Sequence, residues 1–81
     1  MYNVFIKMPG SKAPKSSYYA SLEKAKQVLR EHLLLTKKLN NATGDTLRTI
    51  DYYFESNCNE FTVVFPDGNR YEGWIKKENI A

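Results

Sequence analysis

The chain has 81 residues, of which 42% are hydrophobic and 14% aromatic, so it can build one small domain with one core and is not disordered throughout. Its single cysteine, Cys58, excludes an internal disulfide, the staple on which small secreted domains usually depend. No apolar stretch approaches the roughly 20 residues of a membrane helix, and the first residues lack the pattern of a signal peptide, so we expect a cytoplasmic protein.

The net charge of +3 is divided unevenly along the chain. Residues 1–39 carry eight Lys/Arg and two Glu, a net +6, whereas residues 40–81 carry four Lys/Arg and seven Asp/Glu, a net −3. Such a split is typical either of a partner-binding face or of an ordinary solvated surface, and composition leaves both interpretations open.

The first half of the chain predicts one strand, one loop and one helix. Residues 2–8 alternate between apolar and polar side chains, as a half-buried strand does, and a Pro-Gly pair ends them. Residues 9–19 have few groups to bury, so we expect a mobile basic loop there. Ser21 is a good N-cap, and apolar residues at helical spacing predict a helix over residues 21–39.

The second half predicts a three-stranded meander over residues 47–76, with strands at 47–55, 61–65 and 70–76. Its last turn contains a Pro-Asp-Gly-Asn run, and that turn places Val63 opposite Tyr71 and Phe61 opposite Gly73. The predicted fold is a single α+β domain over residues 1–81, in which one helix packs on a four-stranded antiparallel sheet in the order β-α-β-β-β. The first strand can pair at either edge of the meander.

The predicted sheet has a second face that its core does not need. Exposed aromatic side chains are enriched in protein interfaces, so we expect this face to bind a protein partner. The alternative is that a loop or the flank of the first strand covers Trp74. The candidate protein-binding residues are Phe5, Asp51, Tyr53, Val64, Glu72 and Trp74.

A second candidate surface is basic and could meet nucleic-acid phosphates without reading bases. The chain carries no signature of a known nucleic-acid-binding module, and a lysine-rich helix face is also typical of a solvated surface. The candidate nucleic-acid-binding residues are Lys12, Lys15, Lys26, Arg30 and Lys37.

Catalytic chemistry has little support in the sequence. His32 falls on the apolar face of the predicted helix, and Cys58 falls in a turn, so the two are not expected to meet as a nucleophile and its base. Glu55 and Glu60 would face each other across a hairpin at the edge of the domain, where paired carboxylates are usually solvated. We therefore predict no catalytic residue, no metal site and no cofactor.

The predicted β-α-β-β-β layout, taken over the whole chain, resembles small phage-encoded inhibitors of bacterial defence, including several anti-CRISPR proteins. The resemblance rests on architecture and on no diagnostic motif. It implies a non-catalytic protein that blocks a host nuclease or effector complex in the host cytoplasm, with a protein or ribonucleoprotein complex as its partner. A nucleic-acid-binding protein is the alternative, and a monomer or a homodimer fits either hypothesis.

Overall fold

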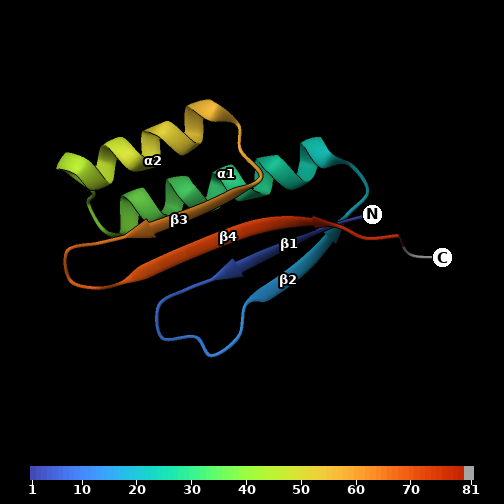
Figure 1. Cartoon of the computed structure of the whole chain (residues 1–81), viewed down its shortest axis with the longest axis horizontal. Coiled ribbons are helices and arrows are strands. Elements are labelled where there is room, and N and C mark those ends of the chain that lie inside the picture. Colours follow the sequence, from blue (N-terminus) through green and yellow to red (C-terminus); the bar gives the residue numbers. More distant parts are fainter. Residues whose placement is uncertain (80–81) are drawn as a thin grey trace.

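The computed structural model describes residues 1–79, which form two helices and one four-stranded antiparallel sheet (Figure 1). The sheet has the order β2-β1-β4-β3. The α+β class and the antiparallel four-stranded sheet are therefore confirmed, whereas the single helix and the order β-α-β-β-β are wrong. In chain order the elements are β1 (Tyr2–Lys7), β2 (Lys15–Tyr19), α1 (Leu22–Leu39), α2 (Gly44–Ser56), β3 (Glu60–Val64) and β4 (Arg70–Lys77).

The expected mobile loop at residues 9–19 contains strand β2. After a turn in which Gly10 has a φ of +81°, the chain returns antiparallel to β1 and pairs Tyr2 with Tyr19 and Ile6 with Lys15. Tyrosine favours strands, and Tyr19 packs against the core, so the segment has more to bury than its polar composition suggests. Strand β1 consequently lies between β2 and β4 and is not an edge strand.

The segment expected to be the first strand of the meander is helix α2. Leu47, Ile50 and Phe54 follow helical spacing, and Ile50 is the member that is fully buried. A strand would have put Ile50, Tyr52 and Phe54 on one face, but Tyr52 is 67% exposed. Short apolar runs fit both periods, and here the helical one packs against α1 and β3.

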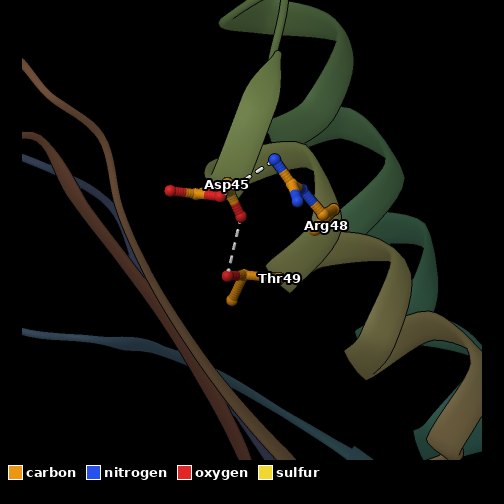
Figure 2. Close-up of polar contacts among 3 residues, drawn as sticks. All are labelled: Asp45, Arg48 and Thr49. Carbon is orange, nitrogen blue, oxygen red and sulfur yellow. Dashed lines mark hydrogen bonds and ion pairs between the residues drawn. The ribbon is translucent and has the colours of Figure 1, made fainter.

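The first turn of α2 is held by local polar contacts (Figure 2). The carboxylate of Asp45 lies 3.1 Å from the guanidinium of Arg48, and the hydroxyl of Thr49 donates to the backbone carbonyl of Asp45 at 2.9 Å. Asp45 also places a negative charge at the positive end of the helix. The helix ends at Asn57, whose φ of +52° is the left-handed conformation common after a helix.

Helix α1 has the bounds that the sequence predicts. The hydroxyl of Ser21 accepts the backbone N–H of Lys24 at 3.1 Å, which is the expected N-cap. The helix ends at Asn40, whose side-chain amide donates to the carbonyl of Thr36 and to the hydroxyl of Tyr71, both at 2.9 Å. The C-terminal cap of α1 is thereby tied to β4.

The β3–β4 hairpin has the predicted register. Phe61 pairs with Gly73 and Val63 with Tyr71, and Gly68 takes a φ of +90° in the turn between the strands. The ring of Phe61 lies over Gly73, so an aromatic side chain covers the position that has none. This hairpin fixes which residues of β3 and β4 face the helices.

One cluster of buried apolar side chains joins both helices to one face of the sheet. Figure 1 shows α1 running alongside the strands and α2 beside it at the β3 edge. The helices thus share the same face, and the opposite face carries the alternate residues of each strand. The buried apolar residues are Val4, Ile6, Ala25, Leu29, Leu33, Ile50, Phe61, Val63, Phe65 and Tyr71.

Candidate functional site

The face of the sheet opposite the helices, here called the open face, is defined by strand alternation. In β1, Val4 and Ile6 point into the core, so Phe5 between them points away from the helices. Cross-strand pairing then builds a row over all four strands, in which Phe5 pairs with Ser16 of β2 and Trp74 of β4. Trp74 pairs with Glu60 of β3, which completes this central row.

An aromatic pair occupies the middle of the open face. The rings of Phe5 and Trp74 are stacked, with centroids 5.3 Å apart and planes inclined by 11°. Both side chains are half-buried, because each covers part of the other. Neither is a member of the core cluster, so the pair is an apolar centre on a surface that no helix covers.

Charged side chains border one side of this aromatic pair. The next row pairs Lys7 with Glu72 and Glu72 with Thr62. Glu72 also accepts from Nε of Arg70 at 2.7 Å. Val64, beyond this row, is 54% exposed. An apolar centre with a mixed-charge rim is the common anatomy of a protein-binding surface.

On the other side of the pair lies a polar row formed by Asn3, Tyr18 and Lys76, none of which is among the candidate residues predicted from the sequence. The amide of Asn3 donates to the carboxylate of Glu78 at 3.3 Å. The same carboxylate raises the pKa of Tyr18. The larger cause is the hydrogen bond that it accepts from the Tyr18 hydroxyl, and the smaller cause is its negative charge, which disfavours the phenolate. Tyr18 is 51% exposed. Its place on this face could be predicted only if residues 15–19 were recognised as strand β2.

Four of the six candidate protein-binding residues share the open face: Phe5, Val64, Glu72 and Trp74. The other two lie elsewhere, because they belong to α2 and not to a strand. The ring of Tyr53 packs edge-on against Phe61 on the core side, with centroids 6.4 Å apart. Asp51 lies 3.6 Å from Nζ of Lys37 and links α2 to α1. The expected anchor Tyr53 and rim residue Asp51 are therefore not part of the open face.

The five candidate nucleic-acid-binding residues are divided between two places. Lys12 and Lys15 belong to the β1–β2 hairpin, at the β2 edge of the sheet. Lys26, Arg30 and Lys37 lie on the flank of α1 that faces α2, and α2 packs at the opposite, β3 edge. The structure does not bring the five together into one basic surface.

A groove of about 430 Å³ separates α1 from α2. Arg30 crosses it, with Cζ of its guanidinium 4.3 Å from the centroid of the Phe54 ring. Lys26 lines the groove one turn before Arg30, Leu34 lines it one turn after, and Asn57 lines it at the end of α2. The sequence predicts Lys26 and Arg30 as candidate binding residues but not the groove, because the groove requires residues 47–55 to be helical and their alternating pattern predicts a strand.

His32 lies in α1, whereas Cys58 lies in the turn between α2 and β3. Burial lowers the pKa of His32, and the nearby Glu31 carboxylate offsets part of this effect. The thiol of Cys58 donates to the backbone carbonyl of Tyr53 at 3.5 Å. Within residues 1–79 no three His, Cys, Asp or Glu side chains are grouped as metal ligands would be. No helix in this part of the chain is long and apolar enough to cross a membrane.

Comparisons with known proteins give this chain no relative. No protein-family model matches the sequence. No curated protein and no solved structure is significantly similar to it.

Proposed function

We propose that this protein is a non-catalytic binding domain that takes a protein partner on the open face of its sheet. The observation that carries the proposal is the stacked pair of Phe5 and Trp74 on a face that both helices leave uncovered. Tryptophan is among the residues most enriched at the energetic centre of interfaces, and flat stacked rings offer apolar area without loss of side-chain freedom on binding.

The rim supports the same proposal. Charges of both signs border the aromatic pair: Lys7, Glu72 and Arg70 lie on one side of it, and Glu60 lies next to Trp74 in the same row. Such a border adds little affinity by itself but restricts the partner to surfaces with the opposite pattern. Stabilisation of the sheet by the cross-strand pair, at about 0.5–1.5 kcal/mol, is the competing explanation for Phe5 and Trp74.

Affinity capture from a lysate of the host cell separates these explanations. The comparison uses the wild type, Trp74→Ala and Tyr52→Ala, since Tyr52 is an exposed aromatic residue on α2, away from the open face. We expect the same partner with the wild type and Tyr52→Ala, and recovery reduced about tenfold or more with folded Trp74→Ala. Equal recovery with all three proteins would contradict the proposal, and unfolding of Trp74→Ala would favour the structural explanation.

We further propose that the partner is a host nuclease or effector complex, bound in the host cytoplasm. This narrower proposal is supported by the small size of the chain and by its α+β fold with an antiparallel sheet, which is the part of the resemblance to phage-encoded inhibitors that does not depend on the β-α-β-β-β order. Expression beside an active CRISPR–Cas system tests it. Entry of a targeted plasmid should rise at least about tenfold with the wild type and not with Trp74→Ala. No rise with the wild type refutes the inhibitor role alone.

Nucleic-acid binding through the basic residues stays a prediction, and no observation favours it over protein binding. Lys37 is paired with Asp51, and Arg30 is stacked on Phe54, so two of the five cations already have partners. A gel shift at low and moderate salt tests it, because phosphate contacts weaken steeply as salt is added. Loss of retention in Lys12→Glu or in Lys26→Glu would show which of the two separate basic places contacts the nucleic acid, and retention by neither protein nor variant at low salt would contradict the prediction.

A further inference from the structure

The groove between α1 and α2 holds a cation that lacks a hydrogen-bond acceptor. Nε of Arg30 is fully buried, and among residues 1–79 no atom accepts its hydrogen. Arginine does not lose its proton in proteins, so this N–H requires an acceptor at every pH. A buried donor without an acceptor is unfavourable. Because Nε itself is covered, a ligand in the groove would meet the terminal N–H groups of the guanidinium, and Nε would gain an acceptor only if the side chain shifted.

The guanidinium is also held in place before any ligand arrives. Its Cζ lies 4.3 Å from the centroid of the Phe54 ring, a cation–π contact between the two helices. A planar group fixed in this way presents its remaining N–H groups in a set direction, which lowers the entropy lost on binding. Neither Arg30 nor Lys26 is within ion-pair distance of a carboxylate in the described part of the chain.

The rest of the groove narrows the class of ligand. Its volume of about 430 Å³ is within the range of sites that take a small ligand or one or two side chains. Leu34 and Phe54 supply apolar contacts next to Arg30. Glu23 and Glu31 line the same groove, so a doubly charged phosphate would meet two carboxylates as well as two cations. A singly charged group beside an apolar one is the better match.

We propose that this groove binds a carboxylate of a peptide partner, with Arg30 receiving the carboxylate and Leu34 and Phe54 contacting an apolar side chain next to it. Arginine and carboxylate match in geometry and can form two parallel hydrogen bonds. The site is separate from the open face, since it lies between the helices on the other side of the sheet. The proposal for this groove is therefore independent of the proposed function of the open face, and the failure of one would leave the other unchanged.

The test is an NMR titration of the full chain with N-acetyl-aspartyl-leucine amide, followed by the Nε–H signal of Arg30 and the backbone amides of Phe54 and Asn57. Its matched control is N-acetyl-asparaginyl-leucine amide, which has the same shape and no charge. We expect saturable shifts at millimolar concentration with the acidic peptide, and affinity lower by about tenfold or more with the neutral one. Equal shifts with both peptides, or none with either, would overturn the proposal.

Variants of Arg30 and Arg48 test which side chain binds the carboxylate of the peptide. Arg30→Gln should reduce the affinity for the acidic peptide about tenfold or more, whereas Arg48→Gln, which removes an exposed arginine of α2 outside the groove, should leave it unchanged. If Arg30→Gln does not fold, Arg30→Lys keeps the charge but loses the planar fork, and should still weaken binding several-fold. Full affinity in a folded Arg30 variant would refute the assignment.

Two further titrations distinguish other anions. Inorganic phosphate and a short oligothymidylate are added to the same labelled protein, with the same signals observed. We expect weaker shifts than with the acidic peptide, because Glu23 and Glu31 oppose a higher charge density. If either probe binds at Arg30 more tightly than the peptide, the ligand is a phosphate and the peptide proposal is wrong.

Discussion

Replacement of Gly73 by alanine tests how closely the sheet and α1 are packed. A Cβ at residue 73 would lie 2.8 Å from Cδ1 of Leu29 and 2.9 Å from Cζ of Phe61, whereas apolar carbons normally approach to about 3.5–4.0 Å. Leu29 and Phe61 are 1% and 3% exposed, so neither side chain can retreat into solvent. Overpacking of this kind costs about 1–3 kcal/mol, only partly offset by the better strand propensity of alanine.

We therefore expect Gly73→Ala to lower the free energy of unfolding by about 2 kcal/mol, and Tm by about 8–16 °C in a domain of this size. Urea unfolding followed by circular dichroism measures the change. A Phe61→Leu background removes the contacts of the added methyl group with the ring and leaves only the one with Leu29, so the cost of Gly73→Ala should fall by about 1 kcal/mol or more. An unchanged Tm, or the same cost in both backgrounds, would refute the packing of Phe61 over Gly73.

Three other predictions concern single contacts. Tyr71→Phe removes the hydroxyl bonded to Asn40 and should lower the unfolding free energy by about 1 kcal/mol in urea titrations; no change would show that the tie contributes nothing. Because burial lowers the pKa of His32 from 6.5, the unfolded chain binds its proton more readily, so this contribution to stability is complete above about pH 6.5 and is lost as pH falls. Tm measured from about pH 7 to 5 should fall more in the wild type than in His32→Gln, and parallel curves would contradict this. Asp51→Asn breaks the exposed pair with Lys37 and should change the unfolding free energy by less than about 0.5 kcal/mol; a larger loss would show that this pair holds α2 against α1.

The sequence predicts those parts of the fold in which one local signal has no competitor. Helix α1 has a capping serine and a long apolar stripe, and the β3–β4 hairpin has a turn with a glycine at its left-handed position. In the hairpin, the pairing of Phe61 with Gly73 follows from alternation alone. Here local propensity and tertiary packing agree, so the expected boundaries and register are found.

Helix α2 and strand β2 could not be predicted with the same arguments. In residues 47–55 the apolar positions fit an alternating pattern and a helical pattern equally, and packing against α1 and β3 selects the helix. In residues 15–19 the polar serines and lysine give no alternating apolar pattern, so the sequence does not predict the strand that pairs with β1 there. Because residues 44–56 are a helix and residues 15–19 a strand, Tyr53 and Asp51 lie away from the open face and Tyr18 lies on it.

The aromatic centre of the candidate site follows from the sequence, because Phe5 and Trp74 belong to β1 and β4, two strands that alternation alone predicts. The α1–α2 groove could not be predicted, since it requires the second helix. Arg30 and Phe54 are 24 positions apart, and only the packing of two helices places the guanidinium on the ring. A sequence signal existed in the helical spacing of Leu47, Ile50 and Phe54, but it competed with a strand pattern of similar strength.

The affinity of the captured partner for three proteins tests the central claim, that the open face binds through its aromatic pair. Isothermal titration calorimetry on the wild type, Trp74→Ala and Tyr52→Ala gives Kd for each, after circular dichroism has shown that all are folded. We predict that Trp74→Ala raises Kd about 30-fold or more, as the loss of an interface centre does, and that Tyr52→Ala changes it less than about threefold. A Kd that is unchanged in folded Trp74→Ala would contradict the claim.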